Sequence, residues 1–414
     1  MIEDVSRTYF RDDVYLQSSI PLDAKVGLIQ MGNNYSRYTP GFGAMSAHFY
    51  AMMTEDEVII TLKELCGVEI EKASLARLVQ TVGEPYLTKQ TGSQSLADSL
   101  PTPGARPLGI LARRINEIDE SPDRDKIVQD ALNGKIDGSG SSGSPGLTIV
   151  YGTSDGTGVP GLKRELSEHG KNGGRAKTFE AKVGVAFKQG FDENGLPALD
   201  KSRNIYRIPG TTQYTATIEK VAPFARQMTE FLASNGVGNA PQAVFLSDGA
   251  IWLSHLPERV FPPHVPLLMI IDKYHAIEHL NELVDKLYFY KADPREKFRT
   301  EARALLDIGN IPEMVALIKD KASSLKPARR EKVDKGLEYF TKNAEKMRYG
   351  LFQAVGLFVG SGVVEAACKT VVGKRLKNAG MHWSKKGASI AIALRCAIMS
   401  GHFDYCRSEF KLAA

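Results

Sequence analysis

Residues 243–249 read Ala243-Val-Phe-Leu-Ser-Asp-Gly249, a short apolar run of strand-forming residues that ends on an acid and a glycine. Two other stretches have the same pattern of an apolar run that leads to an acid. Leu147-Thr-Ile-Val-Tyr151 leads to Asp155-Gly156, and Leu267-Leu-Met-Ile-Ile271 leads directly to Asp272. Short apolar runs bounded by turn residues are typical of buried strands. We therefore predict three strands of one sheet, each ending at an acid.

The neighbouring segments predict that helices alternate with these strands. Residues 181–187 form a further predicted strand, the stretch Asp192-Glu-Asn-Gly195 supplies turn residues, and residues 161–177 are polar and predict a loop. Residues 215–234 have the spacing of an amphipathic helix. Strands alternating with helices predict an α/β fold.

Changes in composition divide the chain. Residues 134–147 are rich in Gly and Ser, and residues 291–350 are rich in Lys, Arg and Glu with helical spacing. The predicted division is a mostly helical N-terminal region at 1–135, a linker at 136–146, the first part of a catalytic core at 147–290, an all-helical insertion at 291–350, the final helices of the core at 351–405 and a tail at 406–414.

A helix-turn-helix is a possible reading of residues 55–82. Residues 55–65 have apolar residues at helical spacing, Gly67 can end that helix, and a second amphipathic segment runs from Ala73 to Val82. In such a unit the second helix would enter the major groove of DNA. Two amphipathic helices joined at a glycine are also common in proteins that bind no DNA.

Composition is that of an ordinary soluble protein. Of 414 residues, 43% are hydrophobic and 24% charged, and the formal net charge is +5. The four cysteines form no CxxC pair, so we expect reduced thiols rather than disulfides or a structural zinc site. The first residues are acidic, unlike a signal peptide, and no apolar run is long enough for a membrane span. We expect a soluble cytoplasmic protein.

The acids Asp155, Asp248 and Asp272 predict a metal site. In open α/β sheets, ligand sites lie beyond the carboxyl ends of the strands. Carboxylates that converge there need a cation, and oxygen ligands suit Mg²⁺ or Mn²⁺. Two such ions stabilise the attacking and leaving oxygens of a phosphodiester displacement. For each acid alone, an ordinary Asp-Gly turn is the alternative interpretation.

A fourth acid, Glu365, follows the glycines of Gly360-Ser-Gly362 near the start of a predicted helix. From Lys369 to Lys386 there are six basic residues and no acid, a pattern that suits a DNA phosphate backbone. Trp383 lies in this stretch and could stack on a base or belong to the core. The predicted DNA-binding residues are Lys369, Lys374, Arg375, Lys377, Trp383, Lys385 and Lys386.

Four motifs together resemble the DDE-type insertion-sequence transposases of the Mutator-like group, and most closely the Kra-type bacterial family. They are Asp155-Gly-Thr-Gly-Val-Pro160, Ser247-Asp-Gly-Ala-Ile-Trp252, Asp272-Lys-Tyr-His275 and Gly360-Ser-Gly-Val-Val-Glu365. The resemblance covers about residues 145–405 and is most specific in 369–403. The N-terminal third departs from it, because it lacks the cysteine-rich segment that some relatives carry.

The resemblance implies an RNase H-like mixed sheet flanked by helices, with a helical insertion before the last acid. It implies that Asp155, Asp248 and Glu365 are the catalytic, metal-binding acids of two Mg²⁺ or Mn²⁺ ions, and that Asp272 and His275 support them. The implied activity is metal-dependent cleavage of DNA at transposon ends and transfer of the strand into target DNA. The implied partners are double-stranded DNA, with its terminal inverted repeats, and a second copy of the chain in a dimer or larger oligomer. Such a protein would be associated with the nucleoid.

Two alternatives remain open. A transposase-derived protein could bind DNA without cutting it. The stretch His275-Ala-Ile-Glu-His279 also matches the H-x-x-E-H motif of inverted zinc proteases, in which the two histidines share a helix face and Glu278 is the general base. That motif leaves Asp155, Asp248 and the basic stretch without a role.

Overall fold

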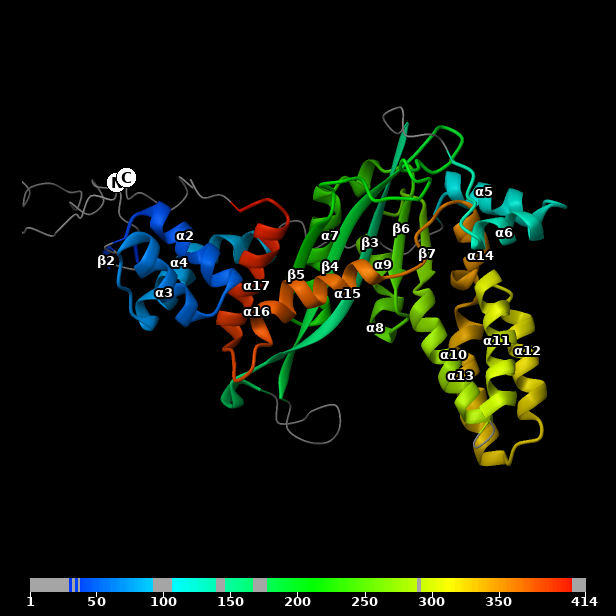
Figure 1. Cartoon of the computed structure of the whole chain (residues 1–414). Helices are drawn as coiled ribbons and strands as arrows, with labels where there is room; N and C mark the ends of the chain where they lie inside the picture. Colours follow the sequence, from blue (N-terminus) through cyan, green and yellow to red (C-terminus); the bar gives the residue numbers. More distant parts are fainter. Residues whose placement is uncertain are drawn as a thin grey trace, which may run out of the picture.

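The computed structural model describes residues 30–31, 34–35, 38–91, 106–138, 146–166, 177–288 and 292–403. A central sheet lies between N-terminal helices at one end and a bundle of long helices at the other (Figure 1). Most of the predicted linker at 136–146 and all of the predicted tail at 406–414 lie outside the described residues.

The five-stranded sheet has the order β5-β4-β3-β6-β7. Its strands are β3 (Leu147–Pro160), β4 (Thr178–Phe191), β5 (Gln213–Thr217), β6 (Ala243–Ser247) and β7 (Leu267–Ile271). The pairs β3–β4 and β4–β5 are antiparallel, whereas β3–β6 and β6–β7 are parallel. A mixed sheet with flanking helices fits the predicted α/β fold.

The strands predicted at 243–247 and 267–271 are confirmed with the same bounds. Two other predictions were wrong. Asp155 does not follow a strand end, because β3 continues to Pro160 and Asp155 pairs with Val183 of β4. The helix predicted at 215–234 begins only at Val221, because residues 213–217 pair with β4 as an edge strand.

Helices cover both faces of the sheet. On one face, Val150 and Phe245 pack with helix α7 (Val221–Ser234) and helix α9 (Leu256–Val260). On the other face, Tyr151 and Val244 belong to a core shared with α10 (Lys273–Leu287) and the helical bundle. The described chain also contains β1 (Gln30–Met31), β2 (Asn34–Tyr35), η1 (Lys163–Glu165), η2 (Val237–Asn239) and α8 (Ile251–Ser254).

The bundle consists of α10, α11 (Ala292–Ile308), α12 (Ile311–Ala322) and α13 (Pro327–Lys342), followed by η3 (Ala344–Met347) and α14 (Tyr349–Ala354). Each long helix presents an apolar face to one core, as amphipathic spacing requires. The described residues of 291–350 are thus helical, as predicted. Figure 1 shows that this bundle lies beside the β7 edge of the sheet.

The N-terminal helices are α2 (Pro40–Met52), α3 (Glu55–Cys66) and α4 (Lys72–Thr91). Thr54 and Glu57 form a capping box that starts α3, and Gly67 ends it with φ +65°. These helices pack against the C-terminal helix α17 (Lys385–Met399) in a second core. Helices from the two ends of the described chain therefore share one hydrophobic core.

Helices α5 (Ile110–Asp119) and α6 (Arg124–Leu132) belong to the other end of the molecule. Leu111, Ile115 and Val128 pack in the same core as the bundle and α14. Helices α2 to α4 of the predicted N-terminal region at 1–135 therefore belong to one core, and α5 and α6 belong to another. These two groups of helices lie at opposite ends of the molecule (Figure 1).

Candidate active site at three strand positions

Three aspartates occupy equivalent positions along three neighbouring strands, with Asp155 inside β3 and with Asp248 and Asp272 directly after β6 and β7. The parallel register pairs Thr153 with Leu246, so Asp155 and Asp248 are both two residues further on. It also pairs Ser247 with Ile271, which brings Asp272 level with Asp248. Because side chains alternate across a sheet, the three acids continue the face on which Leu246 and Ile270 lie, the face covered by α10 and the bundle.

Asp155 is partly buried on β3. Its Oδ1 accepts a hydrogen bond from the N–H of Gly156 at 2.6 Å, and its Oδ2 accepts one from the thiol of Cys368 at 3.6 Å. Burial raises the pKa of Asp155 above its ordinary value, and the charge of Asp248 raises it further. The two hydrogen bonds and the charge of His275 act in the opposite direction. Asp155, Asp248 and His275 therefore share one electrostatic environment.

Asp248 lies in a tight turn at the end of β6. Its Oδ1 accepts a hydrogen bond from the N–H of Ala250 at 2.8 Å, and Gly249 has φ +84°. The hydroxyl of Tyr339, on α13, donates to the Asp248 carbonyl at 3.2 Å. A Cβ at residue 249 would lie 2.9 Å from the Tyr339 ring. The Asp-Gly turn thus packs directly against Tyr339 of the helical bundle.

Asp272 is 1% exposed and acts as a structural link. Its Oδ1 caps α10 by accepting from the N–H of His275 at 2.9 Å, and its Oδ2 accepts from the N–H of Ser361. The N–H of Lys273 also donates to the carbonyl of Val359 at 2.9 Å. These bonds hold the segment before Glu365 against the end of β7. Both oxygens of Asp272 are occupied by backbone donors.

Glu365 lies in the first turn of α15 (Gly362–Ala367) and is exposed. The helix predicted around Glu365 is not regular, because a π-helix, η4 (Cys368–Gly373), follows α15 and precedes the short α16 (Lys374–Leu376). Single-turn π segments often occur at functional sites. Cys368 begins this turn, one helical turn beyond Glu365, and its thiol reaches Asp155.

Cys368 is the residue of this site that the sequence analysis did not identify. Burial raises the pKa of its thiol, as do the charges of Asp155 and Glu365, whereas the charge of Lys377 lowers it. The thiol is therefore a protonated donor between the two acids. Its three-residue spacing from Glu365 was the signal in the sequence, because residues i and i+3 share a helix face.

The histidines of the H-x-x-E-H stretch lie beside the aspartates. The rings of His275 and His279 meet edge to face at 4.8 Å, and His279 contacts the Tyr339 ring at 4.3 Å. Nδ1 of His275 lies 3.3 Å from Glu278. Burial, with the charge of His275, lowers the pKa of His279. His279 thus packs between His275 of the same helix and Tyr339 of α13.

Within the part of the chain that the structure describes, no three His, Cys, Asp or Glu side chains converge closely enough to hold a metal ion. This applies equally to the Asp155, Asp248 and Glu365 set and to the zinc-protease reading of His275 and His279. Two of the acids, Asp155 and Asp248, are adjacent, and their carboxylate oxygens suit Mg²⁺ or Mn²⁺.

Two predicted DNA-binding residues, Arg375 and Trp383, have structural positions instead. Arg375 is 1% exposed and Trp383 is 7% exposed. The guanidinium lies 4.7 Å from the ring centres of both Tyr50 and Trp383, and its Nε donates to the carbonyl of Tyr50 at 2.6 Å. The indole N–H donates to the carbonyl of Leu376. Their burial leaves neither side chain on the surface, which contradicts the predicted role.

The lysines of the basic stretch remain on the surface. Lys369, Lys374 and Lys377 are exposed, and Lys377 donates to the hydroxyl of Thr157 on β3. Lys385 pairs with Glu219 at 2.8 Å and Lys386 with Glu84 at 3.3 Å. The charges of Lys385 and Lys386 are thus partly neutralised by these acids. Lys369 lies in η4, Lys374 in α16, and Lys377 directly after α16.

The helix-turn-helix outline at 55–82 is present as α3, the turn after Gly67, and α4. Residues 55–91 carry seven acids and four basic residues. Lys63 pairs with Glu69, and Lys72 pairs with Asp56. This acidic surface does not have the charge that favours a DNA phosphate backbone.

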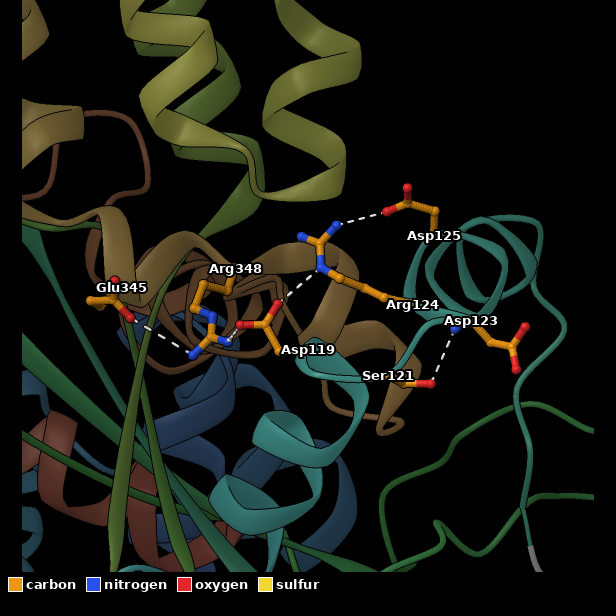
Figure 2. Close-up of polar contacts among 7 residues, drawn as sticks. All are labelled: Asp119, Ser121, Asp123, Arg124, Asp125, Glu345 and Arg348. Atoms are coloured by element: carbon orange, nitrogen blue, oxygen red, sulfur yellow. Dashed lines mark hydrogen bonds and ion pairs between the residues drawn. The ribbon is translucent and has the colours of Figure 1, made fainter.

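A separate charged cluster lies where α5 and α6 meet α14 (Figure 2). Asp119 pairs with both Arg124 at 2.9 Å and Arg348 at 2.6 Å, and Arg348 also approaches Glu345. The cluster borders a cleft of about 250 Å³. Because its arginines are matched by carboxylates, it serves as a junction between helices rather than as an anion site.

No protein-family model matches the chain, and no curated protein does. Among solved structures, it is similar to a chain of the "Drosophila P element transposase strand transfer complex". The identity is 7% and the TM-score 0.30, over 91% of this chain and 95% of that chain. So distant a likeness leaves fold and function to be argued from the residues themselves. No helix among the described residues is long and apolar enough to cross a membrane.

Proposed function

We propose that this protein is a transposase that cleaves DNA strands at the ends of a mobile element and joins them to target DNA, with divalent metal ions. The observation that carries the proposal is the register of β3, β6 and β7, which sets Asp155, Asp248 and Asp272 side by side. Asp272 in turn holds the segment that leads into Glu365. The sheet register and the Asp272 bond thus place these four acids on segments that neighbour one another in the fold.

We further propose that the sheet is RNase H-like and that the chain is a Mutator-like, Kra-type enzyme. The first three strands are antiparallel, and the last two add in parallel on the other side of the first. The helical bundle lies between β7 and α15 in the sequence. Both features agree with the topology that the sequence motifs imply.

The proposed metal ligands are Asp155, Asp248 and Glu365. Burial, with the charge of Asp248, raises the cost of ionising Asp155, which a cation would relieve. Glu365 is exposed on α15, separated from Asp155 by Cys368, so its side chain must turn toward the aspartates to complete the set. When bound, two ions would stabilise the charge on the attacking and leaving oxygens of the phosphodiester.

The other residues have positioning roles in this proposal. Asp272 fixes the start of α10 and the segment before α15, so that His275 and Glu365 keep their places. Lys369, Lys374 and Lys377 would hold the phosphates of the strand that is cut. Joining two DNA ends requires two active sites, so a dimer or larger assembly on double-stranded DNA belongs to the proposal, as does a place in the cytoplasm at the nucleoid.

The test is cleavage of DNA taken from either side of the gene, in Mg²⁺ or Mn²⁺. We expect strand cleavage by the wild-type protein and its loss in Asp155→Asn, Asp248→Asn and Glu365→Gln. Full activity in all three variants would refute the assignment. Binding without cleavage by the wild-type protein would instead identify a catalytically silent DNA-binding protein. One tight zinc ion that is lost in His279→Ala would support the zinc protease.

A further inference from the structure

Tyr274 is a large aromatic residue that remains exposed at the rim of the site. Its exposed fraction is 67%, and it is the one aromatic among the large hydrophobic residues that are well exposed in the described chain. Tyr274 lies between Asp272 and His275, in the first turn of α10. An exposed aromatic ring next to a proposed catalytic centre calls for an explanation, because burying such a ring stabilises a protein.

The ring has a defined position. A Cβ at residue 360 would lie 2.9 Å from Cε2 and 3.2 Å from Cδ2 of Tyr274, so the edge of the ring rests on the backbone of Gly360. That backbone is itself held, because the next residue, Ser361, donates its N–H to Asp272. The tyrosine is thus supported from one side by a glycine and directed by a helix whose first turn is capped.

The segment from Gly360 to Glu365 links the ring of Tyr274 to the proposed ligand Glu365. Gly360 precedes α15, and Glu365 lies three residues after its first residue, Gly362. Three residues correspond to a rise of roughly 5 Å along a helix. Successive bases of one DNA strand are roughly 3.4 Å apart along the duplex. A strand that runs along the start of α15 with a phosphate at Glu365 would therefore have a base one or two nucleotides away near Gly360, on which the ring of Tyr274 rests.

The chemistry of the surroundings favours a nucleic-acid strand as the occupant. Exposed lysines follow Glu365 in the sequence at Lys369, Lys374 and Lys377. A strand would then have phosphates on the lysines, its reacting group at the acids and an unpaired base on the tyrosine. Nucleic-acid binding sites combine positive charge with aromatic stacking surfaces in this way.

We propose that Tyr274 stacks on a nucleobase one or two nucleotides from the phosphate that is cut, so that the site takes a locally unpaired DNA end. This rests on the proposed function and extends it, because it names the form of DNA that the site binds. Stacking tolerates any base, since each base has a π face. The tyrosine would therefore position the strand without reading its sequence.

The test uses the full-length protein and short duplexes from the DNA that flanks the gene, with frayed ends that carry 2-aminopurine at successive positions. Ca²⁺ replaces Mg²⁺ so that binding is measured apart from cleavage. Binding is followed by anisotropy, and stacking by quenching of 2-aminopurine. We expect quenching at one or two positions beside the cleavage site. Tyr274→Ala should remove the quenching and weaken binding about tenfold or more, whereas Tyr274→Phe should retain both.

A matched control is Leu108→Ala, because Leu108 is 58% exposed but lies before α5, away from the acids. This variant should quench like the wild-type protein. Binding by the wild-type protein without quenching at any position would overturn the stacking proposal and leave the proposed function intact. Quenching that persists in Tyr274→Ala would overturn it as well. Absence of DNA binding by the wild-type protein would refute the proposed function and, with it, the role of Tyr274.

Discussion

The carboxylate of Asp272 accepts a hydrogen bond from the backbone N–H of Ser361, which lies 89 residues later in the sequence. The same carboxylate caps α10 at His275, so a single buried acid joins the end of β7 to the start of α15. Asp272, which the resemblance implies as a supporting residue, thus contacts the backbone, with both of its oxygens occupied by amide donors.

Asp272→Asn should destabilise the protein by about 1–3 kcal/mol, the usual cost of losing a buried hydrogen bond to a charged group. The asparagine oxygen can still cap His275, but its amide nitrogen cannot accept from Ser361. Urea unfolding measures the change. The matched control is Asp192→Asn, because both bonds of Asp192 go to Oδ1, which asparagine retains. We expect the control to change stability by less than about 0.5 kcal/mol. Equal losses in the two variants would show that the Ser361 bond contributes nothing.

Removing the thiol of Cys368 should weaken divalent-metal binding. In Cys368→Ala, Asp155 loses the hydrogen bond that fixes its Oδ2, whereas Cys368→Ser keeps a donor at the same place. Loss of a partner that orients a metal-ligating group typically costs 10–100-fold in affinity, so we expect about a tenfold weaker binding of Mn²⁺ in the alanine variant. Titration calorimetry measures it without cleavage.

The control for that experiment is Cys396→Ala, because Cys396 is fully buried in α17 and does not contact the acids. It should lower the stability of the protein and leave Mn²⁺ affinity unchanged. A serine variant as weak as the alanine variant would argue that Cys368 acts by filling space rather than by donating to Asp155.

The residues around these acids show what the sequence could predict. The strands β6 and β7 are apolar runs that end on acids, and their bounds follow from composition alone. Asp155 was misplaced because Gly152, Gly156 and Gly158 are poor strand formers. Their extended conformation is imposed by antiparallel pairing with β4, which local sequence does not reveal.

The burial of Arg375 also depends on distant parts of the chain. Its partners are the Tyr50 carbonyl near the end of α2 and the rings of Tyr50 and Trp383. An arginine among lysines indicates a basic surface, and nothing nearby in the sequence shows that α2 covers it. The same applies to the π-helix, which interrupts the predicted helix after Glu365 and contains Lys369.

Substitutions in the basic stretch should therefore have two different effects: those of exposed lysines should change DNA binding, and that of the buried Arg375 should change stability. Lys369→Ala and Lys374→Ala should each lower DNA affinity and reduce the salt dependence of binding by about one ion, with little change in stability. Arg375→Lys should instead lower the stability of the protein and leave the salt dependence of DNA binding unchanged. It loses two cation–π contacts and a fitted hydrogen bond, which together contribute about 2 kcal/mol or more. Salt titrations of binding and urea unfolding test both expectations. A change of salt dependence in Arg375→Lys with unchanged stability would contradict this division.

Asp155→Asn should make the protein more stable near neutral pH in the absence of metal. Burial, with the charge of Asp248, raises the pKa of Asp155, so the folded protein holds its proton at pH values where the unfolded chain has lost it. Stability contributed by this group therefore falls as pH rises above about 3.9, the ordinary aspartate pKa. The advantage of the asparagine variant should be absent below that pH and grow above it.

Thermal unfolding between about pH 3 and pH 7 measures this difference, with Asp192→Asn as a control whose acid is remote from the site. Added Mg²⁺ or Mn²⁺ should reverse the order of stability, because a bound ion stabilises the folded wild-type protein by mass action and the variant lacks one of its ligands. Only the wild-type protein should then gain a higher melting temperature. A stability difference that does not change with pH would show that Asp155 is not held in an unfavourable charged state. A metal-induced gain of equal size in both proteins would remove Asp155 from the set of ligands.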